Sequence, residues 1–263
     1  MKPDPSRAAI CTPVAPLFAE PKVASAQISQ YLAGRELDIL ETRDDWHRVS
    51  GPDCYEGWMH RGYLAPAPDD AARRSLPNLR VSLGCVTTNQ LGSRRAMPLG
   101  AWLTPDERVR SGEVVEPSER LLRFPPEAGA VTRSAQVYFE GTSYIWGGIT
   151  PWGADCSGLV QSVFWLHGIQ LKRDAWMQAG EGAPGEADPR DARAADLLFF
   201  SDRLDRHITH VAIALGGGCL VHLALGRGGY NIERLEDTAD PYVGKLLDRF
   251  VTARRILAPT LVD

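Results

Sequence analysis

The chain has 263 residues, of which 44% are hydrophobic and 24% are charged, with a formal net charge of −4. This composition is that of an ordinary globular protein, and the absence of a long basic run argues against nucleic acid or an anionic membrane as a partner. No stretch approaches the ~18 uninterrupted apolar residues of a membrane-spanning helix. The length allows one large domain or two to three small ones.

The N-terminus and the cysteines bear on the cellular compartment. Residues 1–18 lack the apolar block of a secretion signal, so we expect a cytoplasmic protein, with the loss of a leader left open. The cysteines are odd in number and scattered, and no Cys-x-x-Cys pair occurs. This argues against a disulfide framework and a zinc ribbon and fits reduced thiols. Taken alone, each cysteine is expected to be packing material.

Two segments rich in proline, alanine and charge, 65–78 and 114–129, divide the chain. Before the first, short strand-like runs separated by turn signals predict a small all-β barrel. The strands around Trp46 and Trp58 resemble those of bacterial SH3-like domains, and both tryptophans are expected in the barrel core. A second and more divergent barrel is expected to follow. The predicted domains are residues 1–68, 76–127 and 128–263.

From about residue 130 the pattern changes to helices followed by strands. The segment "GAVTRSAQVYFEGTS" predicts a helix with Val131, Ala135, Val137 and Tyr138 near one side. "LVQSVFWLHG" predicts a second, apolar helix, and "ADLLFFSD" begins a set of strands. This order predicts an α+β domain.

Cys156 lies where the second of these helices begins. Asp155 is a good N-cap, and apolar residues recur at 159, 160, 163, 164 and 166. In the first turn, unpaired backbone N–H groups and the helix dipole favour a thiolate over a thiol. A helix end contributes only ~0.3–1 kcal/mol, which is less than one pKa unit. A nucleophilic cysteine therefore needs a histidine partner here.

The segment "HVAIALGGGCLVHLA" predicts a hairpin that reverses at the three glycines 216–218. That loop pairs Leu215 with Cys219, Ile213 with Val221 and Val211 with Leu223. Ala212 then lies opposite His222, which makes His210 and His222 diagonal neighbours on one face of the hairpin. The small alanines on this face leave room for something to dock between the histidines.

Cys156, His210 and His222 thus form a candidate nucleophile, base and orienting group. His210 would accept the thiol proton, and His222 would hold the imidazole in the productive tautomer. Zinc is the alternative, since one thiolate and two imidazoles are acceptable ligands. Their spacing matches no common zinc motif, so we expect neither a metal nor another cofactor.

Four blocks in this order resemble the NlpC-type cysteine peptidases of bacterial cell-wall metabolism: "YIWGG" (144–148), "DCSGLV" (155–160), "HVAIAL" (210–215) and "VHLA" (221–224). Two barrels ahead of "DCSG", together with "KRDAWMQAGEG" (172–182), are similar to the YkfC-like γ-D-glutamyl-L-diamino-acid endopeptidases. The resemblance implies a papain-like α+β catalytic domain preceded by two small all-β SH3-like barrels.

The resemblance also implies catalytic roles. Cys156 would be the nucleophile, His210 the base and His222 the third member. The hydroxyl of Tyr144 and the backbone N–H of Cys156 would stabilise the oxyanion. Trp146, in the same block as Tyr144, is expected to be core packing.

For substrate binding, the resemblance implies that Tyr55 and Asp174 hold the free amine of an N-terminal L-Ala. Asp155 and Ser157 are candidate ligands for the substrate backbone or the D-Glu carboxylate, although Asp155 is equally a plain helix cap. Arg173 is either a carboxylate ligand or a salt-bridge strut, with the strut favoured. The chain departs from the family at two positions, Ala175, where relatives often have Ser, and Ala26, where they often have Glu.

The predicted function is hydrolysis of the bond between γ-D-Glu and a diamino acid in murein peptide fragments, as part of cell-wall peptide recycling. No nucleic-acid or membrane partner is expected. Two alternatives stay open, a papain-like amidase or acyltransferase acting on another amide, and a catalytically inactive peptide-binding module.

Overall fold

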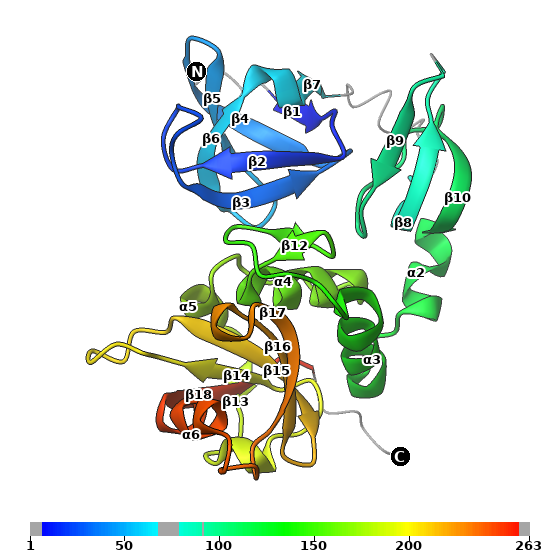
Figure 1. Cartoon of the computed structure of the whole chain (residues 1–263). Helices are drawn as coiled ribbons and strands as arrows, with labels where there is room; N and C mark the ends of the chain where they lie inside the picture. The colour runs from blue at the N-terminus through cyan, green and yellow to red at the C-terminus, as the bar shows by residue number, and fades with distance from the viewer. Residues whose placement is uncertain (1–6, 68–78, 91, 258–263) are drawn as a thin grey trace. The chain divides into compact units, whose positions relative to one another are not determined.

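The computed structural model describes residues 7–67, 79–90 and 92–257. The chain divides into two compact units, Met1–Arg123 and Phe124–Asp263, coloured blue to cyan-green and green to red in Figure 1. The predicted domain limits at residues 68, 76 and 128 stay predictions.

Among the described residues, no helix has both the length and the hydropathy that crossing a bilayer requires.

The first unit begins with a seven-stranded antiparallel sheet in the order β3-β2-β6-β5-β4-β1-β7. Its elements are β1 (Arg7–Ile10), β2 (Val14–Phe18), β3 (Gln27–Leu32), β4 (Glu36–Arg43), β5 (Trp46–Ser50), β6 (Glu56–His60), the short 3-10 helix η1 (Arg61–Tyr63) and β7 (Leu64–Pro66). The sheet encloses a core of Ile10, Ala15, Leu17, Tyr31, Leu37, Val49 and Met59. The prediction of a small all-β fold for this region is confirmed.

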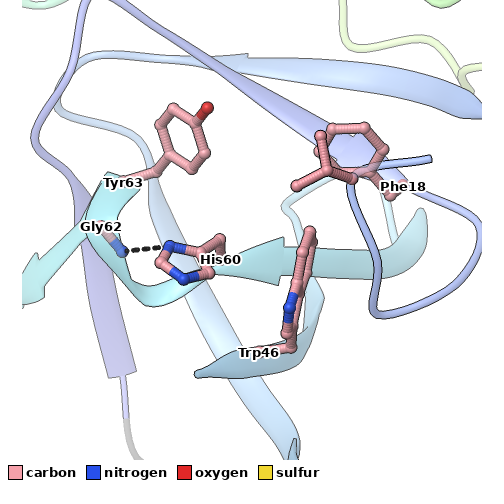
Figure 2. Close-up of a pocket in the computed structure, with 6 residues that line it drawn as sticks. Phe18, Trp46, His60, Gly62 and Tyr63 are labelled. Carbon is pink, nitrogen blue, oxygen red and sulfur yellow. Dashed lines mark hydrogen bonds between the residues drawn. The ribbon is translucent and has the colours of Figure 1, made fainter. Parts of the chain in front are cut away.

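The two tryptophans of this sheet have different environments. Trp58 is buried, as predicted. Trp46 is only half-buried, so its predicted place in the core is wrong. It lines a cavity of about 370 Å³ with Phe18, Val23, His60, Gly62 and Tyr63 (Figure 2). The Trp46 ring meets those of Phe18 and His60 edge to face, with centroids 5.6 and 5.4 Å away.

A three-stranded antiparallel sheet in the order β10-β8-β9 follows. Its strands are β8 (Val81–Thr88), β9 (Arg94–Met97) and β10 (Arg108–Val115), and helix α2 (Pro117–Arg123) comes after them. The buried Glu107 carboxylate accepts hydrogen bonds from Arg95 at 2.9 Å and Thr87 at 3.1 Å. A complete second barrel stays a prediction, since the residues described in this region form three strands.

The second unit is built on a six-stranded antiparallel sheet in the order β13-β18-β14-β15-β16-β17 (Figure 1). The strands are β13 (Ala183–Pro184), β14 (Leu197–Phe200), β15 (His210–Gly216), β16 (Cys219–Ala224), β17 (Gly229–Arg234) and β18 (Phe250–Arg255). The helices are α3 (Ala128–Phe139), α4 (Cys156–Leu166), α5 (Ala175–Gln178) and α6 (Pro241–Asp248). Shorter elements are the hairpin β11 (Ile149–Thr150) with β12 (Gly153–Ala154), η2 (Pro189–Asp191) and η3 (Leu225–Arg227). The predicted α+β class is confirmed.

Helix α3 packs against α4, which in turn packs against β15 and β16. On α3, Val131 and Ala135 are buried as predicted, and Phe139 continues the same side one turn later. The prediction for Val137 is wrong, because this side chain is exposed. Two residues on from Ala135, it has rotated by about 200° to the opposite side of the helix.

The hairpin β15–β16 confirms the predicted pairing of Ile213 with Val221. The prediction for Leu215 is wrong, since a register shift makes Gly216 the partner of Cys219. Strand β15 therefore includes Gly216, and only residues 217 and 218 lie between the strands. All three glycines have positive φ angles of 83°, 57° and 68°, which residues with a side chain adopt only at a cost.

The hairpin face with the two histidines is covered by helix α6. Ala212, Ala214 and Leu220 of this face form one apolar cluster with Leu246 of α6. The space that the alanines were predicted to leave for docking is thus filled by the protein itself.

Candidate active site

Cys156 is the first residue of α4, as predicted, and Asp155 caps the helix. The carboxylate Oδ1 of Asp155 accepts a hydrogen bond from the Gly158 N–H at 2.7 Å, and Oδ2 accepts one from the Gly147 N–H at 2.8 Å. Glycine is required at 158 because a Cβ there would collide with the carbonyl oxygen of Gly148. The "GG" and "DCSG" blocks are therefore packed against each other around the start of the helix.

A buried ion pair reinforces this cap. The guanidinium of Arg173 donates to Asp155 through both carboxylate oxygens, at 3.0 and 2.7 Å, and to the Ser157 hydroxyl at 2.9 Å. The side chains of Arg173 and Asp155 are 1% and 7% exposed. Such a two-point pair fixes orientation as well as position. The structure gives these three side chains a structural role, and their part in binding substrate stays a prediction.

The Cys156 thiol lies in a setting that opposes its ionisation. Burial raises the pKa of Cys156 to about 12, and the charge of Asp155 acts in the same direction. Hydrogen bonds from the backbone N–H groups of Val211 and Ser157 lower this pKa, but by less. The predicted preference of the helix start for a thiolate is therefore outweighed by desolvation. The bond to Val211 also places Cys156 beside the residue that follows His210.

The two histidines of the hairpin are in direct contact. Nε2 of His210 lies 3.0 Å from Nδ1 of His222, and the two rings meet at 68°. Burial lowers the pKa of His210 well below its usual range, and the neighbouring His222 and Arg249 lower it further. A neutral imidazole in this place is able to accept a proton, as a general base must.

A carboxylate that was not predicted from the sequence lies behind the two histidines. Oε1 of Glu233, on β17, lies 3.4 Å from Nε2 of His222. Because β17 pairs with β16 so that Asn231 faces His222, Glu233 is the next residue along on the same side of β17. The alternation of residues in "YNIERL" places Asn231 and Glu233 on the same side of a strand. It indicates a carboxylate near His222 only when the pairing of this strand with β16 is known.

Tyr144 lies close to the nucleophile. The pKa of its phenol is raised, first by burial and then by the nearby Cys156 and Asp155. The hydroxyl therefore keeps its proton and remains a hydrogen-bond donor. The backbone N–H of Tyr144 donates to the carbonyl of Gly228 at 3.0 Å, which holds this segment beside η3.

Comparison with known proteins decides the family. A family model described as "NlpC/P60 family" matches residues 141–246, and one described as "Bacterial dipeptidyl-peptidase Sh3 domain" matches residues 17–64. Dipeptidyl-peptidase 6 of Lysinibacillus sphaericus is 37% identical over 255 residues, covering 85% of this chain and 90% of that protein. This chain belongs to the NlpC/P60 family.

Other relatives of this NlpC/P60 protein match over smaller parts. The γ-D-glutamyl-L-lysine dipeptidyl-peptidase of Bacillus cereus is 25% identical over 74% of this chain, and the match spans 66% of that protein. The Bacillus subtilis protein of the same name is 39% identical over 41% of this chain, and this match covers 36% of the Bacillus subtilis protein. A solved NlpC/P60 family structure from Bacillus cereus has a TM-score of 0.77 at 18% identity, covering 96% of this chain and all of that one. At this identity the likeness shows the fold, which is the expected one.

The two residues predicted to hold the substrate amine lie in different units of this NlpC/P60 protein. Tyr55 is half-buried against the core of the first sheet, and its backbone N–H donates to Asp53 at 3.2 Å. Asp174 is half-buried at the N-cap position of α5, where its side chain makes no capping hydrogen bond. Their shared role stays a prediction.

Two further expectations concern Trp146 and zinc. Trp146 is 64% exposed, so its predicted place in the core is wrong. Ile149, three residues later on β11, is buried instead. In the part of the chain that the structure describes, no three His, Cys, Asp or Glu side chains are grouped so that they could hold the zinc ion of the alternative interpretation.

The raised pKa of Cys156 predicts how this NlpC/P60 protein reacts with iodoacetamide. Only the thiolate is alkylated, so with a pKa of about 12 the rate at Cys156 should rise roughly tenfold per pH unit from pH 7 to 10. Peptide mapping by mass spectrometry separates Cys156 from the other four cysteines. A rate that levels off below pH 8 would instead show a preformed thiolate–imidazolium pair.

Proposed function

We propose that this chain is a cysteine endopeptidase that hydrolyses the bond between γ-D-Glu and a diamino acid in cell-wall peptides. The observation that carries this is the 3.0 Å contact of His210 with His222, next to the backbone N–H that hydrogen-bonds to Cys156. The names of the relatives support the peptide class, since two are γ-D-glutamyl-L-lysine dipeptidyl-peptidases.

In the proposed reaction, Sγ of Cys156 attacks the γ-carbonyl carbon of D-Glu while His210 accepts the thiol proton. The neutral resting thiol makes this transfer part of the attack rather than a step before it. The oxyanion accepts hydrogen bonds from the Tyr144 hydroxyl and the Cys156 N–H, donors that are typically worth about 2.7–4 kcal/mol each.

Collapse of this intermediate breaks the C–N bond, and His210 gives its proton to the amine that leaves with the diamino acid. The acyl group stays on Cys156 as a thioester. Water then attacks the thioester, again losing its proton to His210, and the γ-carboxylate is released as the thiol is restored. No cofactor takes part in this proposal.

The proposal extends to murein peptide fragments with a free N-terminal L-Ala, used in cytoplasmic recycling. An ammonium group held away from water needs a carboxylate and a further acceptor, and Asp174 with the Tyr55 hydroxyl are the proposed pair. The sequence resemblance supports this assignment. The free thiols support the compartment, since all five cysteines are unpaired.

We expect L-Ala-γ-D-Glu-L-Lys and its diaminopimelate counterpart to be cleaved after D-Glu, and their N-acetylated forms to be cleaved at least tenfold more slowly. Acetylation removes the charge that Asp174 is proposed to pair with, which is worth about 1.5–3 kcal/mol as a charge-assisted hydrogen bond. Mass analysis of the products gives the bond cleaved and the initial rates.

The variant Asp174→Asn should raise KM for the free peptide and leave the acetylated one unchanged. Asp188→Asn is the matched control, because Asp188 is likewise a half-buried carboxylate at an N-cap position, and its side chain pairs with Arg190. Equal rates on free and acetylated peptides would contradict the amine site, and no cleavage of either would contradict the proposed reaction.

A further inference from the structure

Glu233 is a buried carboxylate that the proposed reaction does not use. It is 4% exposed, and it lies on β17 behind His222, on the side away from His210. In the described part of the chain, Nε2 of His222 makes no well-aligned hydrogen bond, and Oε1 of Glu233 is the acceptor near it, at 3.4 Å. An isolated charge in such a buried position would be costly, so the groups around Glu233 must compensate for its lost hydration.

The surroundings keep Glu233 ionised. Burial alone would raise its pKa, but the nearby His222 and the hydrogen bonds from Arg227 and Asn231 lower it to about 2. Arg227 donates to both carboxylate oxygens, at 2.8 and 2.9 Å, and Asn231 donates to Oε1 at 2.6 Å. A carboxylate in this state can only accept hydrogen bonds.

Other contacts hold His222 and Arg227 in place. The ring of Tyr242, on α6, meets the His222 ring nearly at right angles, with centroids 6.0 Å apart. The guanidinium of Arg227 lies 4.2 Å from the centre of the Tyr242 ring and also pairs with Asp240 at the start of α6. Helix α6 therefore supports both the His222 imidazole and the Arg227 guanidinium from one side.

The ionised Glu233 carboxylate determines which ring nitrogens of His222 and His210 carry protons. Because Nε2 of His222 faces the Glu233 carboxylate, the neutral imidazole carries its proton on Nε2. Nδ1 of His222 then has the lone pair. Nδ1 can then take part in the 3.0 Å contact only as an acceptor, so Nε2 of His210 must donate to it. A neutral His210 that carries its proton on Nε2 has a free lone pair on Nδ1.

We propose that Glu233 is a positioning residue that sets the tautomers of both histidines, leaving Nδ1 of His210 as the nitrogen that accepts the Cys156 proton. The carboxylate touches neither substrate nor thiol and acts through His222. This inference rests on the proposed roles of Cys156 and His210 but makes a claim about the resting protein that can be tested without substrate.

The direct test is nitrogen NMR of the protein labelled with ¹⁵N-histidine, which resolves protonated from unprotonated ring nitrogens for its six histidines. We expect the proton on Nε2 in both His210 and His222 of the wild type at neutral pH. Assignment uses the single variants His210→Gln and His222→Gln. A proton on Nδ1 of His222 in the wild type would overturn the proposal, whatever the enzyme's substrate proves to be.

The kinetic test compares Glu233→Gln with Glu233→Asp. The amide of Gln can donate as well as accept, so the tautomer is no longer imposed. We expect kcat to fall by about 10–100-fold with KM unchanged, the range found when the partners that orient metal-binding histidines are removed. Asp keeps the charge and should recover part of kcat. The control Glu236→Gln removes an exposed carboxylate just after the same strand and should match the wild type.

A Glu233→Gln variant with a wild-type kcat would overturn the proposal, as would one that loses activity with both tautomers unchanged. Loss of kcat together with mixed tautomers supports it. If this variant does not fold, the tautomers of the wild type still decide the question.

Discussion

Replacement of Cys156 by alanine should lower kcat on γ-D-glutamyl peptides by on the order of 10⁶-fold, as expected when the nucleophile of a covalent mechanism is removed. Without Sγ there is no thioester, and the remaining donors can only polarise the carbonyl toward water. The thiol is 6% exposed and small, so its loss should leave secondary structure unchanged by circular dichroism. Turnover by mass spectrometry gives the rate.

Cys219→Ser is the matched control for this prediction, since Cys219 is a free thiol in the same unit at the start of β16. It should retain wild-type turnover. A thioester adduct on Cys156, trapped from substrate at low pH, should be present in the control and missing in Cys156→Ala. Normal turnover by Cys156→Ala would end the proposal of a cysteine nucleophile.

The parts of the site that could be predicted from sequence are those that depend on short-range rules. Asp155 caps α4 because a short acceptor side chain precedes an apolar helix, and both signals lie within one turn. The register of Ile213 with Val221 follows from alternation on the two sides of three glycines, because a slip by one residue would turn a histidine toward the apolar face.

Other parts depend on which elements pack together, which a local pattern does not contain. The role of Glu233 requires the pairing of β17 with β16, and the cover over Ala212 requires α6 to fold back onto the hairpin. The pKa of Cys156 required the burial of the helix start, a property of the whole unit. The helix-end contribution and its size follow from a local pattern, whereas the larger desolvation that opposes it does not.

The largest effect on stability is expected at the buried pair of Arg173 and Asp155. Arg173→Met should lower the free energy of unfolding of its unit by about 3–5 kcal/mol, because it leaves a carboxylate that is 7% exposed without its cation. Hydrogen exchange of the α4 amides in low urea reports on this unit alone. Arg203→Met, which removes an exposed pair with Asp205, is the control and should leave the exchange unchanged.

The double variant Asp155→Asn/Arg173→Met separates a broken ion pair from general damage to the fold. Each single variant leaves one buried charge uncompensated, whereas the double variant removes both charges and keeps an oxygen acceptor at the N-cap. It should therefore be more stable than Arg173→Met alone, with a coupling energy within the roughly 0.5–3 kcal/mol found between contacting residues. If the stability losses of the two single variants simply add in the double variant, the Arg173 guanidinium does not stabilise the fold through Asp155. That result would fit a role for Arg173 as a ligand for a substrate carboxylate. Coupled losses would assign Arg173 to the strut that holds Cys156 at the start of its helix.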